Sequence, residues 1–125
     1  MVHVREATTE ELDTVITILD AAILETDRDV VRRSVRTELT LVALEDGRVL
    51  GAVVALPADR GVRIDGIAVR KRRQGNRLGS MLVETLLDRH GRVVAAFDDR
   101  VRPFYESLGF DVTNVAPGRY RGVWD

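Results

Sequence analysis

The segment between Arg70 and Arg77 carries the clearest signal for chemistry, because five of its eight residues are basic and it contains Gly75. An apolar run ends just before this segment, and a helical pattern of apolar residues begins at Leu78. The first turn of a helix leaves backbone N–H groups unpaired and carries a partial positive charge, and glycine lets an anion approach the main chain. The segment therefore predicts a binding site for a phosphate-bearing ligand.

Two common phosphate-binding patterns do not explain this site. The chain contains neither the GxxxxGK[ST] sequence of a P-loop nor the GxGxxG fingerprint of dinucleotide-binding proteins. A different kind of glycine loop must therefore account for residues 70–79.

The stretch RRQGNRLGS, residues 72–80, resembles motif A of the GNAT superfamily of N-acetyltransferases, whose pattern is [QR]xxGx[GA] shortly after a strand that ends in Ala-Val. The pattern fits in two registers, starting at Arg72 or at Gln74, and in both of them Arg77 stands where the family has glycine or alanine. An arginine there must point its side chain away from the pyrophosphate or add a guanidinium contact to a phosphate. Because Gly75 and Gly79 flank Arg77, the sequence favours a loop that binds the phosphate with altered geometry over a loop that no longer binds it.

Two further stretches support the same resemblance. DDRVRPFYESLGF, residues 98–110, resembles the family's helix motif that ends in Phe-Tyr-Glu-x-x-Gly-Phe. RIDGIAV, residues 63–69, is similar to the acidic fourth strand of some members, glucosamine-6-phosphate acetyltransferases among them. The motifs occur in the family's order, so the resemblance covers nearly the whole chain.

The resemblance implies that acetyl-CoA is the co-substrate and that no metal takes part. Backbone groups of Ile67 and Val69 would pair with the pantetheine amides, and the pyrophosphate would lie on the N–H groups of residues 74–79. Arg72 and Arg73 would meet the pyrophosphate or the 3′-phosphate. The implied cofactor-binding residues are Ile67, Ala68, Val69, Arg72, Arg73, Gln74, Gly75, Asn76, Arg77, Leu78, Gly79, Ser80 and Tyr105.

The resemblance also implies a direct transfer of the acetyl group to a primary amine, which needs two proton transfers. Tyr105 matches the family tyrosine that protonates the leaving sulfur, and an unperturbed phenol, with a pKa of about 10, stays protonated at neutral pH. Asp65 is the first candidate for the base, acting directly or through a water, and Asp98 is the second, or orients the amine. The alternative for Tyr105 is a core position, for Asp65 a solvent-facing or arginine-paired carboxylate, and for Asp98 a solvated strand end or a helix N-cap.

Composition excludes several classes of function. The chain of 125 residues has no cysteine and only two histidines, so disulfides, thiol redox chemistry and thiolate zinc sites are excluded. Its longest uncharged stretch, residues 49–58, is too short for a membrane helix, and we expect a cytoplasmic protein. Residues 1–59 hold 6 basic against 12 acidic side chains and residues 60–125 hold 13 against 8, so the second half is the one suited to an anion.

The periodicity of apolar residues predicts an α/β fold in a single domain, residues 1–125, with helices on both faces of a mixed sheet. The family resemblance adds a sheet that is splayed at its centre, between the fourth and fifth strands. Gly66 in the middle of a strand indicates a bulge or a close backbone approach. The predicted strands are residues 2–5, 39–44, 49–56, 62–69, 93–97, 110–115 and 119–124, and the predicted helices are residues 9–24, 27–37, 78–90 and 101–108.

Two other functions remain open at the level of sequence. An arginine-rich module could bind nucleic acid, but residues 70–82 contain no aromatic side chain to stack on bases, which argues against nucleic acid as a partner. A protein of the same fold could bind an acyl-CoA without transferring the acyl group, and Arg77 motivates this alternative.

The acceptor is not identified, although the arginines of residues 28–36 would suit one with a carboxylate or phosphate. The exposed pair of closing strands would allow a homodimer through a sheet edge or through the last helix.

Overall fold

The computed structural model describes residues 1–22, 27–74 and 77–125. Its strands are β1 (Val2–Glu6), β2 (Thr40–Glu45), β3 (Arg48–Pro57), β4 (Val62–Val69), β5 (Val93–Asp98), β6 (Asp111–Ala116) and β7 (Arg119–Trp124). Its α-helices are α1 (Leu12–Ala21), α2 (Arg28–Arg36), α3 (Leu78–His90) and α4 (Arg102–Leu108), and the short 3-10 helices are η1 (Thr9–Glu11) and η2 (Lys71–Arg73). Each strand and α-helix expected from the sequence is present.

The structure differs from the sequence-based expectation at the ends of elements and in one additional short helix, η2. The first predicted helix begins as the 3-10 turn η1, where the Thr8 N–H donates to the Glu11 carboxylate at 2.9 Å. Its predicted end at residue 24 falls outside the described residues, and α1 ends at Ala21. The turn η2 was not expected, because a polar run of basic residues carries no periodic apolar signal.

The seven strands form one mixed sheet in the order β1-β2-β3-β4-β5-β7-β6. Only the β4–β5 pair is parallel, and the other neighbours are antiparallel. The Asp46–Gly47 turn joins β2 to β3, with both residues at positive φ, as the sequence predicts for a tight hairpin. The expected mixed α/β class is therefore confirmed.

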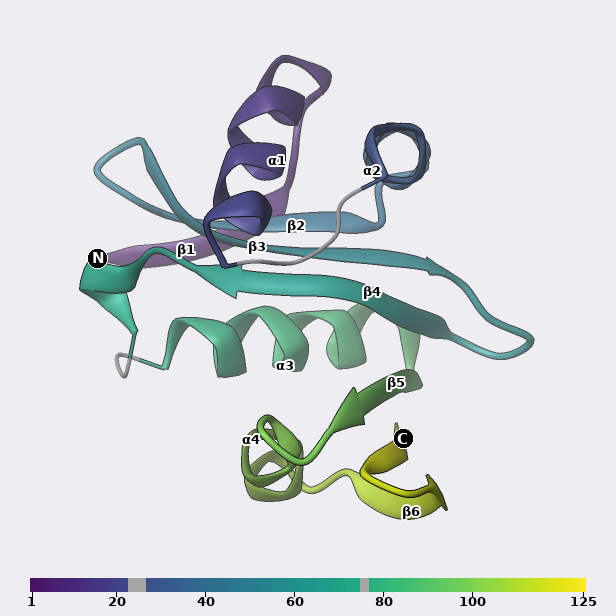
Figure 1. Ribbon diagram of the computed structural model, residues 1–125. Coiled ribbons are helices and arrows are strands. Elements are labelled where there is room, and N and C mark those ends of the chain that lie inside the picture. Colours follow the sequence, from purple (N-terminus) through teal and green to yellow (C-terminus); the bar gives the residue numbers. More distant parts are fainter. Residues whose placement is uncertain (23–26, 75–76) are drawn as a thin grey trace.

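Helices cover both faces of the sheet (Figure 1), and each face has its own apolar core. On one face α1 and α2 bury residues such as Val15 and Val31 against β2 and β3. On the other face α3 buries Leu82 and Leu86, and α4 contributes Tyr105. No helix among residues 1–22, 27–74 and 77–125 is both long and apolar enough to cross a bilayer.

The sheet opens between β4 and β5, which diverge in Figure 1. These strands pair only at Val62 with Val93 and at Arg63 with Val94. The Val62 N–H also donates to the Arg92 carbonyl at 2.9 Å, so the strands are held together where they begin. The expected central splay is confirmed: beyond Arg63 and Val94 the facing backbone edges of β4 and β5 are not paired with each other, and we call this unpaired stretch the slot.

Candidate active site

The slot between β4 and β5 is bordered by strand edges that lack a strand partner beyond Arg63. On the β4 side lie Ile67, Ala68 and Val69, of which Ala68 is buried and the other two are half-buried. The other edge of β4 pairs with β3, and the other edge of β5 pairs with β7. Backbone N–H and C=O groups along the slot are therefore available to a ligand that lies between the strands, as a pantetheine chain with its amides would.

The N-terminus of α3 lies after the end of β4, and among the described residues no side chain caps it. Its N-cap residue, Arg77, makes no capping hydrogen bond from its side chain, and no acidic residue is in the first turn. The N–H groups of Leu78, Gly79 and Ser80 therefore have no acceptor within the helix, and the helix dipole adds a partial positive charge. Of the predicted loop residues, Gly75 and Asn76 lie outside the described residues.

Arg77 adopts a backbone conformation that normally belongs to glycine, with φ of 65° and ψ of 12°. The need for this left-handed turn explains physically why glycine would be preferred here. The Arg77 side chain is 78% exposed and lies 3.6 Å from Glu84, farther along α3. The side chain therefore lies along α3 toward Glu84 in this structure.

Arg73 and Arg72, both expected to meet phosphates, differ in their surroundings. Arg73 donates to both carboxylate oxygens of Glu45, at 2.6 and 3.3 Å, and this pairing lowers the pKa of Glu45. The pair ties η2 to the β2–β3 hairpin. Arg72 is exposed and takes part in none of the ion pairs found among the described residues. Gln74 donates to the Val69 carbonyl at 3.3 Å and so closes the turn after β4.

Tyr105 lies in an aromatic cluster beside the slot. Its ring stacks on Phe97 of β5 with centroids 4.4 Å apart and meets the edges of Phe104 and Phe110 at 5.1 and 5.0 Å. The residue is only 4% exposed, and burial raises the pKa of its phenol to about 12. Tyr105 is therefore a protonated donor throughout the physiological pH range.

The comparisons with known proteins agree with this geometry. The sequence model described as "Acetyltransferase (GNAT) family" matches residues 6–110. The chain belongs to the GNAT acetyltransferase family. A search of curated proteins found no match.

Solved structures of GNAT proteins share the fold over almost their whole length. Ard1 from Thermoplasma volcanium is 20% identical, with a TM-score of 0.83 over 99% of this chain and 96% of that one. YncA from Salmonella typhimurium, solved with its cofactor acetyl-CoA, is 21% identical, with a TM-score of 0.78 over 100% and 94%. The PaiA N-acetyltransferase from Thermoplasma acidophilum, solved with coenzyme A, is 14% identical, with a TM-score of 0.79 over 98% of both chains.

Asp65, the first candidate for the base in this GNAT chain, lies in a β-bulge. Gly66 pairs with Val54 and Ile64 pairs with Ala55, so Asp65 has no partner on β3. The bulge that Gly66 predicted is therefore confirmed. A bulge redirects the side chain of the extra residue, and Asp65 is exposed on the strand that borders the slot. This position leaves its carboxylate exposed to solvent.

Asp98, the second candidate for the base, is engaged in a turn at the end of β5. Its carboxylate accepts from the Arg100 N–H at 2.9 Å and from the Arg100 guanidinium at 3.1 and 3.3 Å. These hydrogen bonds from Arg100 lower the pKa of Asp98, which makes it a weaker base than an ordinary aspartate. The structure favours the strand-end interpretation of Asp98 over a direct role in deprotonation.

Two features of the site region were not found from the sequence. Tyr120 of β7 is 8% exposed, stacks near Phe97 at 6.1 Å and donates to Asp99 at 2.6 Å. Arg48 joins the basic residues at the end of β4 across the β2–β3 hairpin. No local pattern marks either residue, because the partners are more than twenty positions away. Among the described residues no group of three or more metal-ligating side chains gathers.

Proposed function

We propose that this chain is an acetyl-CoA-dependent N-acetyltransferase that moves an acetyl group to a primary amine of a small molecule or peptide. The observation that carries the proposal is the uncapped N-terminus of α3 next to the open slot between β4 and β5. A helix N-terminus suits a pyrophosphate, and an open strand edge suits the amides of pantetheine. Membership of the family supports this use of the two features, as do the relatives solved with acetyl-CoA and coenzyme A.

The cofactor would lie along the edge of β4. Backbone groups of Ile67 and Val69 would pair with the pantetheine amides, and the donors of Leu78, Gly79 and Ser80 would hold the pyrophosphate. The Cβ that Gly79 lacks would lie 3.4 Å from the Phe104 ring, at the close end of ordinary contact, so a side chain larger than alanine would press on α4. Gly79 therefore couples the phosphate-binding turn to the helix that carries the proposed acid.

The reaction would be a direct displacement. The neutral amine attacks the thioester carbonyl carbon, a C–N bond forms, and the C–S bond breaks as the tetrahedral adduct collapses. Tyr105 donates its phenolic proton to the departing thiolate sulfur, and the proton lost by the amine passes to Asp65 directly or through water. The high pKa of Tyr105 keeps the phenol protonated at neutral pH, so the residue is in its donor form when the C–S bond breaks.

A second possibility is that the chain binds an acyl-CoA and does not transfer the acyl group. Arg77 favours this possibility, because a strained arginine replaces a small residue in the phosphate-binding turn.

A cytoplasmic location and a homodimer are further proposals. The outer strand β6 is one sheet edge that a second copy could pair with.

The test is an assay of thiol release. The purified chain is incubated with acetyl-CoA and, in turn, with polyamines, amino acids, amino-sugar phosphates and peptides that have a free N-terminus. The proposal expects release of coenzyme A, together with an acetylated product seen by mass spectrometry, for at least one class of amine. Binding of acetyl-CoA without release on any class would favour the non-catalytic alternative.

A further inference from the structure

One face of the sheet is covered by helices over only part of its width. The apolar core beneath α1 and α2 takes its strand residues from β2, β3 and β4, and none of the described residues of β5, β6 or β7 belongs to it. Figure 1 agrees, with α1 and α2 beside β2 and β3 and away from β5 and β6. On the opposite face, the core beneath α3 and α4 includes Ile64, Phe97 and Tyr105. An acceptor can therefore approach the slot from the face that α1 and α2 leave uncovered.

Alternation along the strands shows which side chains lie on that uncovered face. Val62 and Ile64 of β4 are buried in the core beneath α3 and α4, and the exposed Arg63 lies between them. In the same way, Ala96 is exposed between two buried residues of β5, and Arg121 is exposed between two buried residues of β7. We call this surface the open face, and its described residues include Arg63, Ala96, Thr113, Arg119 and Arg121.

Two arginines of the open face have only uncharged residues opposite them. On the adjoining strands, Arg63 and Arg121 are paired with Leu56, Val94, Ala96 and Thr113. Among residues 1–22, 27–74 and 77–125, neither arginine takes part in an ion pair. Both guanidinium groups are therefore available to an anion that comes from outside the chain.

Arg119, on the same strand and face as Arg121, differs from it in this respect. Its partner across the ladder is Asp98 of β5. The pKa of Asp98 is lowered mainly by hydrogen bonds from Arg100, and the charge of Arg119 contributes to the same shift. Arg119 thus has an acidic neighbour that Arg121 lacks, which makes it a matched control.

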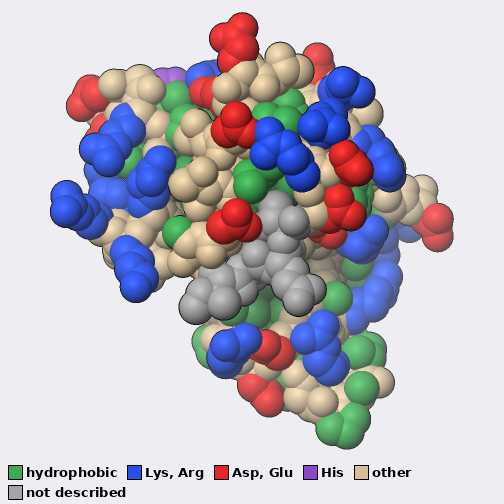
Figure 2. All heavy atoms as spheres, turned by 45° about the horizontal axis from the view of Figure 1, so that its top comes forward, with side chains coloured by type: hydrophobic (Ala, Val, Ile, Leu, Met, Phe, Trp, Pro, Cys, Tyr) green, Lys and Arg blue, Asp and Glu red, His purple; other side chains and the backbone are tan. Residues whose placement is uncertain are grey.

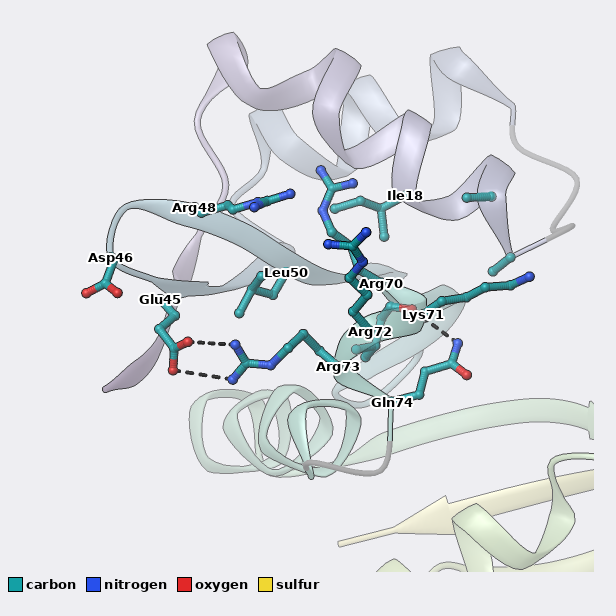
Figure 3. Close-up of a pocket in the computed structure, with 13 residues that line it drawn as sticks. Ile18, Glu45, Asp46, Arg48, Leu50, Arg70, Lys71, Arg72, Arg73 and Gln74 are labelled. Carbon is teal, nitrogen blue, oxygen red and sulfur yellow. Dashed lines mark hydrogen bonds and ion pairs between the residues drawn. The ribbon is translucent and has the colours of Figure 1, made fainter.

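The other groups of basic residues do not border the open face. Figure 3 shows Arg48, Arg70 and Arg72 at the end of β4, next to the turn that would hold the phosphates of the cofactor. On α2, whose arginines the sequence suggested for an acidic acceptor, Arg28 and Arg32 are already paired with aspartates. Recognition of an acceptor by positive charge therefore falls to the open face.

Arg121 is close enough to the slot for this role. Only β5 separates Arg121 from the slot, and neighbouring strands lie about 4.8 Å apart. Ala96, directly opposite Arg121, is too small to block an arginine side chain that extends across β5. On the other side of the slot Asp65 is exposed on β4. Figure 2 shows basic and acidic side chains together on the lower part of the molecule, where α4 and β5 to β7 lie.

We infer that the acceptor is a primary amine that also carries a carboxylate, and that Arg121, together with Arg63, binds this carboxylate. The fork of N–H donors on a guanidinium matches the two oxygens of a carboxylate. The amine would lie in the slot beside Asp65, so each charged group of the acceptor meets the opposite charge. The inference rests on the proposed transfer reaction and names the class of acceptor that this reaction uses.

The kinetic test compares three amines of the same chain length. These are γ-aminobutyrate, butylamine, which lacks the carboxylate, and putrescine, which has a second ammonium in its place. We expect kcat/KM, measured by thiol release from acetyl-CoA, to be highest for γ-aminobutyrate and lowest for putrescine. The ratio of kcat/KM for γ-aminobutyrate to that for butylamine should fall by about ten-fold or more in Arg121→Gln, because a charge-assisted hydrogen bond is lost. Arg63→Gln should lower the ratio in the same direction, and Arg119→Gln should keep it.

A binding measurement tests the carboxylate site without turnover. Isotope-labelled protein is titrated with γ-aminobutyrate and with butylamine at constant ionic strength, and the backbone amide shifts are followed by NMR. We expect γ-aminobutyrate to cause saturable shifts at Ala96 and Gly122, next to Arg121 in the sheet. Arg121→Gln should lose these shifts while its other amide signals show an intact fold, and Arg119→Gln should retain them.

Two kinetic results would overturn the inference and leave the transferase function standing. One is acetylation of butylamine or putrescine at least as efficient as that of γ-aminobutyrate. The other is an equal loss of preference in Arg119→Gln and Arg121→Gln, which would mean that only the general surface charge matters. If no amine is acetylated, the proposed function fails and the titration decides about the site. Saturable shifts that depend on Arg121 would then support a carboxylate site, and their absence would overturn it.

Discussion

Gly61 lies so close to the carbonyl group of Arg92 that a Cβ on this glycine would meet the oxygen at 2.0 Å. The contact joins the residue before β4 to the residue before β5, next to the only two register pairs between these strands. The contact between Gly61 and Arg92 therefore holds β4 and β5 together where they begin, and the strands diverge from there. Gly61 belongs to none of the motifs that mark the binding site in the sequence.

Replacing Gly61 with alanine should destabilise the fold more than the same change at Gly91. Both glycines have a left-handed φ, 73° and 76°, but a Cβ at Gly91 would have nothing within 4 Å. Gly91→Ala should cost about 1 kcal/mol for the backbone conformation alone. Gly61→Ala should cost about 1 to 3 kcal/mol more, because the Arg92 backbone must move. Equal free energies of unfolding in urea for the two variants would contradict the close contact.

Replacing Arg77 with glycine should stabilise the protein without loss of acetyl-CoA affinity. Glycine adopts the left-handed conformation freely, and the net gain should be about 0.5 to 1 kcal/mol after its greater freedom in the unfolded chain is counted. Arg77→Ala is the matched control, because alanine keeps the backbone strain and should bring no such gain. Urea unfolding and titration with acetyl-CoA check both variants. A ten-fold loss of affinity in Arg77→Gly would show that the guanidinium contacts a phosphate after all.

Glu11 should make the fold sensitive to acid. The Arg5 guanidinium donates to both of its carboxylate oxygens at 2.8 Å, and this hydrogen bonding lowers the pKa of Glu11 to about 2 from the ordinary 4.5. Since the folded pKa lies below the unfolded one, the stabilisation is complete above pH 4.5 and is lost as pH falls toward 2. We expect roughly 1 to 2 kcal/mol, because Arg5 is partly exposed.

Denaturant titrations between about pH 2 and pH 6 check this dependence. Glu11→Gln should remove most of the dependence of the unfolding free energy on pH that this pair contributes at acid pH. Glu10→Gln, which changes an exposed neighbour, should leave that dependence in place. The same slope in the Glu11→Gln variant and in the wild type would mean that the Arg5 pair does not control acid stability.

Tyr105→Phe should lower turnover and leave cofactor binding intact. The phenylalanine ring keeps the stacking on Phe97 and loses only the hydroxyl, so acetyl-CoA affinity should stay within about two-fold. Turnover on an amine found by the thiol-release assay should fall by about 100-fold, the usual scale for a lost general acid. Tyr120→Phe, which removes the hydroxyl that donates to Asp99, is the control. Unchanged turnover in Tyr105→Phe would remove the acid role from this residue.

The elements can be predicted well from the sequence because their signals are local. Apolar residues at helical or alternating spacing indicate all the α-helices and strands, and Gly66 within an apolar strand indicates the bulge. The anion site could be placed at the start of α3, because the apolar helical pattern begins at Leu78, directly after the glycine loop.

Contacts between distant residues could not be predicted in this way. Arg73 was expected at a phosphate, but it is paired with Glu45, 28 positions away, through the β2–β3 hairpin. Arg48 meets the basic run at residues 70–72 for the same reason. The raised pKa of Tyr105 arises from burial among aromatic residues of β5 and α4, and local sequence patterns do not measure that burial.

Titration calorimetry with acetyl-CoA tests the central claim most directly, because the transferase proposal depends on the slot and the α3 N-terminus together forming the cofactor site. We expect one-to-one binding of acetyl-CoA, and of free coenzyme A, with a dissociation constant on the order of micromolar, about −8 kcal/mol in binding free energy. A short duplex DNA should bind only weakly and lose its affinity as salt rises. Failure of both coenzyme A species to bind, with the protein folded, would contradict the proposed cofactor site and the transferase function with it.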